Sequence, residues 1–157
     1  MWYYRKKKKK EGPVKRVKLE DKDKSELVMV LDRYFALYIR LRDTMPNGMC
    51  WCISCGKIKP FEKMDCGHYV SRANFSLRYS ELNCNAECSQ CNRMSSDHLI
   101  GYRDNLIRKI GQAKYDYLIA ESKTIKHYER FELLAMIKYY KKEVERLSKE
   151  KGIKVSV

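Results

Sequence analysis

Four cysteines stand in two pairs whose spacing is typical of metal-binding knuckles. Cys52 and Cys55 form one Cys-x-x-Cys pair, Cys88 and Cys91 form the other, and 32 residues separate the pairs. Each pair supplies two thiolates from one tight turn, and two such turns complete the tetrahedron that Zn²⁺ takes in closed structural sites. The alternative is a redox or disulfide pair, but neither an oxidising compartment nor a thioredoxin-like strand–helix–strand context is indicated. The spacing therefore predicts one structural zinc site.

One histidine, His68, lies between the two pairs, in the run Met-Asp-Cys-Gly-His. A neutral imidazole, with an ordinary pKa of about 6.5, can take a proton from water at pH 7. Because four cysteines already satisfy zinc, we assign His68 as a general base; a zinc ligand or a packed imidazole is the alternative. Asp65 is the acidic residue close to His68, so its carboxylate is the natural ligand for a divalent ion, unless it only caps the hairpin turn.

The wider pattern resembles a nuclease family. It comprises Y-I-R-L-R-D, C-x-x-C-G-K, M-D-x-G-H-Y-V-S-R, L-R-Y and N-x-x-x-x-C-x-x-C-N-R, and spans roughly residues 34–110. This order is similar to that of the HNH (ββα-metal) nucleases, to their zinc-stapled branch that includes phage endonuclease seven, and to the phage NinG/Rap recombination endonucleases. The resemblance implies an α+β, mostly helical fold. A small zinc-bound treble-clef or ββα-metal core would be flanked by an N-terminal helix and C-terminal helices.

The resemblance also assigns roles to two asparagines. Asn83, five residues before Cys88, corresponds to the asparagine that holds the histidine-bearing loop through hydrogen bonds; a turn-forming role is the alternative. Asn92 would give its amide oxygen to Mg²⁺ or Mn²⁺, or would cap a helix. The sequence departs from the family at Gly67, the residue directly before His68, because the family ordinarily has a metal ligand at the position before the base. Asp65 shares the strand face of Gly67 but lies one pleat back, about 7 Å away.

The implied activity is a metal-dependent DNA endonuclease acting on branched recombination intermediates such as Holliday junctions or displacement loops. His68 would deprotonate water, and one divalent ion held by Asp65 and Asn92 would bind the phosphate and the leaving oxygen. The resemblance implies products with 5′-phosphate and 3′-hydroxyl ends. Three arginines in or beside the motif would clamp phosphates, or would be ordinary surface charge: Arg72, Arg78 and Arg93.

Helical periodicity places these residues between two long helices. The first is expected from Asp23, which forms a capping box with Glu26, to about Thr44. Short strands follow over residues 49–58 and 64–70, then a helix containing Asn92, one from near Leu99 to Ile110 and one over 112–122. The last helix, over 126–149, would pack on the first helix or pair with a second copy. We therefore expect a basic disordered arm (1–22), a helix plus zinc-stapled nuclease core (23–111) and a C-terminal helical extension (112–157).

Composition indicates the partner. The net charge is +14, which favours a polyanion, and nucleic acid more than a membrane surface. Nine lysines and arginines lie in residues 1–18, where they form a phosphate-binding arm or a solvated tail. The protein is expected in a cytoplasm, because its thiols are reduced, it would bind zinc, and the sequence shows no apolar leader and no membrane span. For a phage protein this is the cytoplasm of the bacterial host. A junction has near-twofold symmetry, so a homodimer would fit.

Other residues and other functions receive less support. His98 and His127 are expected to be surface or packed histidines, and Cys66 and Cys84 buried thiols. Cys50 could replace Cys52 as a zinc ligand, although the family pattern favours Cys52. A non-catalytic zinc module that binds DNA explains the charge and the four cysteines equally well. A scaffold that joins recombination proteins explains less.

Overall fold

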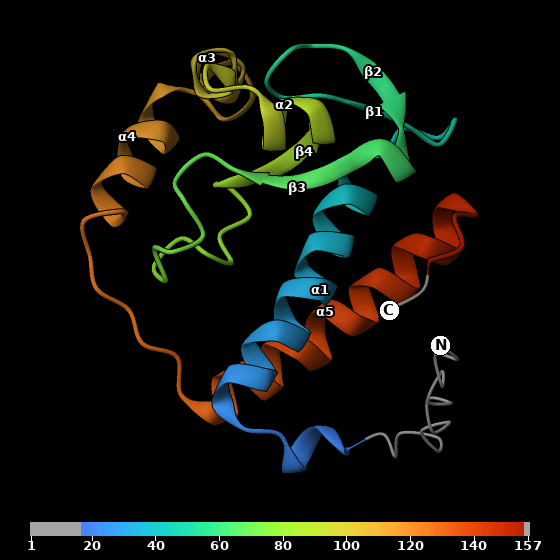
Figure 1. Ribbon diagram of the computed structural model, residues 1–157, viewed down its shortest axis with the longest axis vertical. Coiled ribbons are helices and arrows are strands. Elements are labelled where there is room, and N and C mark those ends of the chain that lie inside the picture. The colour runs from blue at the N-terminus through green and yellow to red at the C-terminus, as the bar shows by residue number, and fades with distance from the viewer. Residues whose placement is uncertain (1–16, 156–157) are drawn as a thin grey trace, which may run out of the picture.

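The computed structural model describes residues 17–155, so the part of the basic arm before Val17 lies outside the described residues. Two long helices lie side by side beneath two short β-hairpins, and three further helices follow the second hairpin (Figure 1). The fold is α+β, as expected. In chain order the helices and strands are α1 Lys24–Arg42, β1 Met49–Trp51, β2 Ile58–Pro60, β3 Met64–His68, β4 Cys84–Cys88, α2 Ser89–Met94, α3 His98–Ile110, α4 Gln112–Glu121 and α5 Arg130–Lys151. Two 3-10 turns, Leu19–Asp21 and Phe61–Lys63, precede α1 and β3.

The start of α1 is fixed by the predicted capping box. The Asp23 carboxylate accepts the backbone N–H of Glu26 at 2.8 Å, and the Glu26 carboxylate accepts the N–H of Asp23 at 3.0 Å. These two bonds satisfy N–H groups that have no partner within the helix. The helix then buries an apolar stripe that contains Leu27, Leu31 and Phe35.

Helix α5 packs on α1, which is one of the two arrangements that the sequence left open. The rings of Phe35 and Tyr140 meet edge to face with centroids 5.0 Å apart, and Val144 and Leu147 extend the same core. Near the start of α5 the Phe131 side chain is 72% exposed, whereas Leu133 and Ile137 are buried in the core shared with α1.

The last turn of α5 also closes the end of α1. The Lys151 ammonium group donates to the backbone carbonyls of Leu41 at 2.7 Å and Arg42 at 3.2 Å, and to that of Thr44. Carbonyls at a helix C-terminus lack partners within the helix and carry partial negative charge, so a cation there is favourable. This contact lies where α1 leads into the first hairpin.

The two hairpins are antiparallel. In the first, Met49 pairs with Pro60 and Trp51 with Ile58. In the second, Met64 pairs with Cys88 and His68 with Cys84. Residues 64–70 were expected to form one arm of a hairpin, but no strand was predicted over residues 84–88. The residues of β4, Cys-Asn-Ala-Glu-Cys, have little intrinsic strand preference, and all five are buried.

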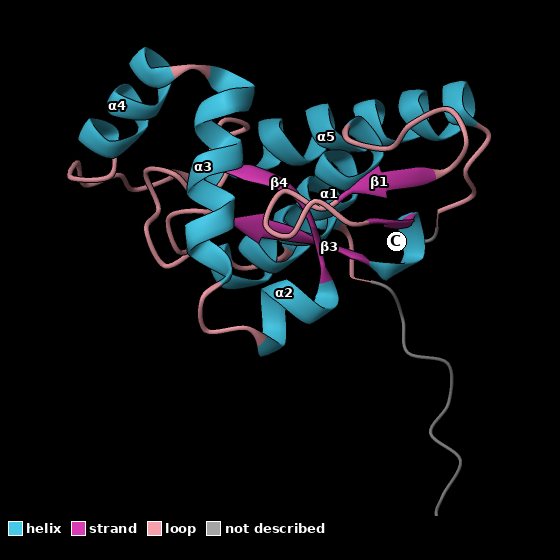
Figure 2. Ribbon diagram, turned by 90° about the horizontal axis from the view of Figure 1, so that it is seen from above, coloured by secondary structure: helices cyan, strands magenta, loops and turns pink. Residues whose placement is uncertain are grey.

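Helix α3 is fixed against both hairpins, and in the view from above it runs across the ends of β3 and β4 (Figure 2). The Tyr102 hydroxyl donates to the carbonyl of Gly67 at 2.9 Å, and the Asn105 amide donates to the carbonyl of Ile53 at 2.8 Å. The helix approaches closely at Gly101, where a Cβ atom would lie 2.2 Å from the carbonyl oxygen of Ser54. Among residues 17–155, none of the helices has both the length and the apolar character needed to cross a bilayer.

Candidate functional site

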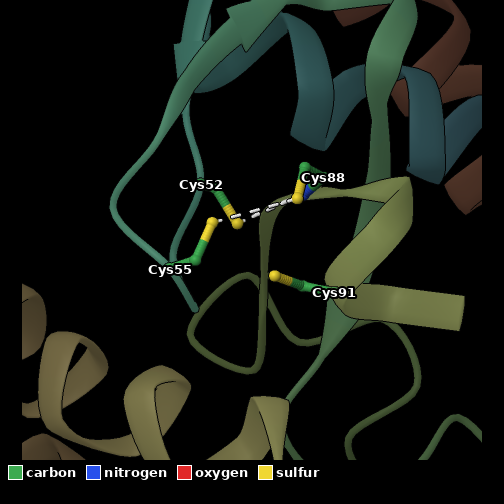
Figure 3. Close-up of side chains that lie close together, drawn as sticks. All are labelled: Cys52, Cys55, Cys88 and Cys91. Atoms are coloured by element: carbon green, nitrogen blue, oxygen red, sulfur yellow. Dashed lines mark hydrogen bonds between the residues drawn. The ribbon is translucent and has the colours of Figure 1, made fainter. Parts of the chain in front are cut away.

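The four predicted cysteines converge. Cys52 and Cys55 lie in the loop of the first hairpin, Cys88 ends β4, and Cys91 lies in α2 (Figure 3). All four Sγ atoms lie within 4.8 Å of one another, and Cys55 Sγ is 4.0 Å from Cys88 Sγ. We call this group the four-cysteine cluster. Four thiols that converge from two knuckles fit the tetrahedral donor set of a structural site, so the cluster could hold a metal ion such as zinc.

Local backbone geometry shapes the first knuckle. The N–H of Gly56 donates to the carbonyl of Cys52 at 2.9 Å, and the N–H of Cys52 donates to the carbonyl of Lys57 at 2.9 Å. Gly56 has φ = 71°, a left-handed conformation that glycine adopts without steric cost. Cys50 lies outside the cluster, with its Sγ 3.1 Å from the Thr44 hydroxyl, so the preference for Cys52 over Cys50 agrees with the geometry.

The thiols of the cluster differ in acidity. Burial raises the pKa of Cys52. Burial acts in the same direction on Cys55, but the backbone N–H of Lys57 and the neighbouring thiols outweigh it and hold the pKa of Cys55 below its ordinary value. Cys55 therefore loses its proton more readily than Cys52, as a metal ligand must.

A cavity of about 640 Å³ opens beside the second hairpin. It is lined by side chains from β3, from the loop after it, and from the α2–α3 region, and these include Asp65, His68, Arg72, Asn92, Arg93 and His98. We call it the Asp65–His68 cavity. Five of the residues assigned from sequence as catalytic, metal-binding or DNA-binding thus share one cavity.

Asp65 and Asn92 are in contact. The Asn92 amide nitrogen donates to Asp65 Oδ2 at 3.2 Å, so the two proposed ligands for a divalent ion are brought together although 27 residues separate them. Arg93 donates to both carboxylate oxygens, at 2.8 and 2.7 Å. Burial pushes the pKa of Asp65 up, but the hydrogen bonds from Arg93 and Asn92 outweigh it and hold that pKa below its ordinary value. The carboxylate is therefore ionised and faces a cation.

The His68 imidazole is half-buried between two backbone carbonyls. Its Nε2 lies 3.1 Å from the carbonyl oxygen of Arg78, and its Nδ1 lies 3.3 Å from that of Cys66. Burial lowers the pKa of His68, and this outweighs the opposing effect of the two carbonyls, so the ring is neutral at pH 7. A neutral imidazole donates only one hydrogen bond. The shorter contact favours Nε2–H as the donor to Arg78, which leaves the lone pair on Nδ1.

Asn83 clamps the segment that follows His68. Its Oδ1 accepts the N–H of Val70 at 2.8 Å, and its Nδ2 donates to the carbonyls of Val70 at 2.9 Å and Leu77 at 3.1 Å. The Asn83 side chain is fully buried, and its own carbonyl accepts the N–H of Tyr69 at 3.0 Å. This geometry is the loop-holding arrangement that the resemblance implies.

The three arginines differ in availability. Arg78 forms a two-point ion pair with Asp32, at 2.9 and 2.5 Å, and only 14% of its side chain is exposed. Its guanidinium group is therefore committed within the fold. Arg93 is 68% exposed and pairs with Asp65, whereas Arg72 is exposed at the rim of the cavity. Arg72 and Arg93 are thus the two whose side chains are exposed beside the cavity.

Sequence reasoning missed a buried carboxylate. Glu87 is 0% exposed, and its Oε1 accepts bonds from the Ser54 hydroxyl and from His98 Nδ1 at 2.7 Å. Its Oε2 has no hydrogen-bond partner among residues 17–155. A Cβ atom on Gly67 would lie 2.3 Å from this Oε2, so the Glu87 side chain fills the space that a side chain at position 67 would occupy. Only the pairing of β3 with β4, which was not foreseen, could have revealed this.

The remaining histidines and cysteines are placed as follows. His127 is exposed, as expected, while His98 is held by Glu87 and lines the Asp65–His68 cavity. Cys84 is fully buried, as expected, but Cys66 is only half-buried and also lines this cavity.

Comparison with known proteins identifies the family. A family model described as "Bacteriophage Lambda NinG protein" matches residues 3–150. The chain is 36% identical over 101 residues to Protein ninG of Escherichia phage lambda, an alignment that covers 63% of this chain and 47% of that protein. It is 34% identical over 108 residues to Protein ninG of Salmonella phage P22, covering 68% and 50%. The chain thus spans about half the length of the curated relatives it matches, and no solved structure matches it. The chain therefore belongs to the NinG family, which the spacing of its cysteines, histidine and asparagines already indicated.

Proposed function

We propose that this protein is a metal-dependent DNA endonuclease of the HNH type that acts on branched recombination intermediates. One observation carries the proposal: Asp65 and Asn92, in contact at 3.2 Å, share a cavity with the neutral imidazole of His68. A hard-oxygen donor pair beside a base is what hydrolysis of a phosphodiester requires. The hairpin β3–β4 followed by α2 would be the ββα unit, and zinc in the four-cysteine cluster would fix its position.

Asp65 and Asn92 fit a hard divalent cation such as Mg²⁺ or Mn²⁺. Both offer oxygen donors, and the Asp65 carboxylate already pairs with the cationic Arg93 side chain, which is exposed and free to move into solvent. When bound, the ion would neutralise charge on the phosphate and on the leaving oxygen. Mg²⁺ keeps several waters, so two protein ligands are sufficient.

His68 would supply the base. With Nε2–H held by the Arg78 carbonyl, Nδ1 accepts a proton from water as the water oxygen bonds to phosphorus. The bond from phosphorus to the 3′ oxygen breaks and this oxygen takes a proton from solvent, which leaves 5′-phosphate and 3′-hydroxyl ends. Asn83 acts by holding residues 69 and 70, so that the strand end carrying His68 keeps its position. Arg72 and, once released from Asp65, Arg93 would bind the flanking phosphates.

DNA as the partner also follows from charge. The net charge of +14 provides a long-range attraction for a polyanion. A four-way junction presents two equivalent strands, so two copies of the chain would place one cavity at each. Sedimentation of the protein with and without a junction tests this dimer directly.

The decisive experiment compares three proteins on a synthetic four-way junction and on a duplex of the same sequence, with Mg²⁺. The His68→Ala variant should bind the junction but not cut it. The His127→Ala variant, which removes an exposed histidine outside the cavity, should cut like the parent. If the parent and both variants bind without cutting, the protein is a non-catalytic zinc module that binds DNA. Equal cleavage of duplex and junction would disprove the preference for branched DNA.

A further inference from the structure

A second group of side chains that could bind a metal ion lies on the second hairpin, at the end opposite Cys88. Cys66, His68 and Cys84 lie on one face of the second hairpin, because His68 pairs directly with Cys84 and Cys66 precedes His68 by two residues. Their two Sγ atoms and one imidazole nitrogen all lie within 4.8 Å of one another. No role proposed above uses either thiol.

The donor set has the chemistry of a zinc site with three protein ligands. Zinc binds thiolate at about 2.3 Å and imidazole at about 2.0–2.1 Å, so its ligand atoms lie roughly 3.5–3.8 Å apart in a tetrahedron. The three atoms, already within 4.8 Å of one another, need to close by about 1 Å to meet that geometry. Cys66 and His68 line the Asp65–His68 cavity, which leaves a fourth position that water can fill from the cavity.

We propose that Cys66, His68 and Cys84 form a second zinc site, distinct from the four-cysteine cluster. Zn²⁺ enters as the two thiols release their protons to solvent, and the neutral imidazole donates its lone pair. The ion therefore gains two thiolates and one nitrogen, and the protein loses two protons.

Occupancy of this site has a consequence that rests on the proposed function. The lone pair of His68 cannot bind zinc and accept a proton from water at the same time. Zinc at the second site would therefore switch off the nuclease, while zinc in the four-cysteine cluster stabilises it. The two sites would give zinc opposite effects at different concentrations.

Metal stoichiometry tests the site without reference to cleavage. The parent, a Cys66→Ala variant and a Cys50→Ala control are saturated with Zn²⁺, freed of excess ion and analysed for zinc per chain by mass spectrometry. Cys50 is the matched control, because it is a free thiol of the first hairpin that lies outside both groups. We expect Cys66→Ala to hold one zinc fewer than the parent, and Cys50→Ala to hold the same number as the parent. Equal zinc in the parent and in Cys66→Ala would overturn the proposal.

Cobalt gives an independent readout. Co²⁺ bound to thiolate absorbs in the near ultraviolet, and the parent would have six ligating thiolates, four in the cluster and two in the second site. The Cys66→Ala, Cys84→Ala double variant should lose the part of this absorbance that comes from two of the six thiolates. Thermal unfolding with cobalt bound shows whether the variant remains folded. If one variant fails to fold, Cys66→Ala alone still decides, because Cys66 is only half-buried. An unchanged cobalt spectrum in a folded variant contradicts the second site.

Inhibition separates this inference from the proposed function. Zinc is titrated into junction cleavage with Mg²⁺, and each protein's rate is normalised to its own zinc-free rate. The zinc concentration that halves the rate should rise in Cys66→Ala and stay at the parent value in Cys50→Ala; no difference between the two would refute the inhibitory role. A parent that holds the second zinc but never cuts DNA would refute the nuclease and leave the metal site standing.

Discussion

Replacing Asn83 with alanine should cost more stability than any single surface hydrogen bond can supply. The side chain makes three hydrogen bonds to backbone groups of Val70 and Leu77, and it is fully buried. At about 1 kcal/mol for each bond, Asn83→Ala should lower the free energy of unfolding by about 3 kcal/mol. The N–H and carbonyl groups left unpaired in the interior would raise this figure.

Asn105→Ala provides a matched control. The Asn105 side chain donates to the carbonyl of Ile53 at 2.8 Å and accepts an exposed bond from Arg108 at 3.1 Å. Because the exposed bond within one helix contributes little, loss of the side chain should cost about 1 kcal/mol. Urea unfolding of the zinc-loaded proteins measures both values. Equal losses for Asn83→Ala and Asn105→Ala would refute the clamp, because a difference of about 2 kcal/mol follows from the bond count.

Cleavage gives the second half of this prediction. In conditions where both variants are more than nine-tenths folded, as circular dichroism can establish, Asn83→Ala should cut the junction much more slowly than Asn105→Ala. The reason is that Val70 lies two residues after His68, and the Asn83 side chain holds both its N–H and its carbonyl. Wild-type turnover by folded Asn83→Ala would show that the position of this segment does not matter to the chemistry.

Three further outcomes are expected. Arg93→Ala should bind Mn²⁺ more tightly than the parent, as measured by electron paramagnetic resonance, because the ion no longer competes with a guanidinium for Asp65; unchanged or weaker Mn²⁺ binding would mean that the ion does not bind there. In the Asp43→Asn variant, the free energy of unfolding should fall less on acidification than it does in the parent. Burial pushes the pKa of Asp43 up, but Arg42 and Lys109 outweigh it and keep that pKa low. The ionised Asp43 carboxylate therefore stabilises the parent at pH values above about 3.9, its pKa in the unfolded chain, and this stabilisation is lost as the pH falls through the lower pKa of the folded protein. Urea unfolding at a series of pH values measures the free energy of unfolding. Chelation of zinc should cost far more than any point substitution, since structural zinc contributes about 10–16 kcal/mol in small domains, and loss of ellipticity on chelation checks it; a fold insensitive to complete zinc removal would contradict a structural role.

Local signals in the sequence predicted the parts of the fold that local physics determines. The capping box of Asp23 and Glu26 fixes the start of α1 within the chain's own first turn, and the Cys-x-x-Cys spacing fixes each knuckle. Both depend on residues only a few positions apart. The meeting of Asp65 with Asn92 also followed from the family pattern, without any account of how the chain brings them together.

The features that were missed depend on distant partners. Strand β4 forms because β3 offers its edge, and its composition gives no strand signal of its own. Arg78 was expected to face DNA, but Asp32, 46 residues away, binds its guanidinium group within the fold. Glu87 fills the space above Gly67 only because the two strands pair in this register, so the meaning of that glycine could not be obtained from spacing.

The Lys151 contact ties the carboxyl end of the described chain to the base of the first hairpin. Three carbonyls at the end of α1 share one ammonium group that lies 107 to 110 residues further along the chain and is therefore synthesised after them. A ribosome-bound chain that has not yet extruded α5 would therefore hold the first knuckle on an uncapped helix with an exposed apolar face. Ending the chain before Lys151 should loosen metal binding at the first knuckle, so any trimmed version made for crystallisation should keep Lys151.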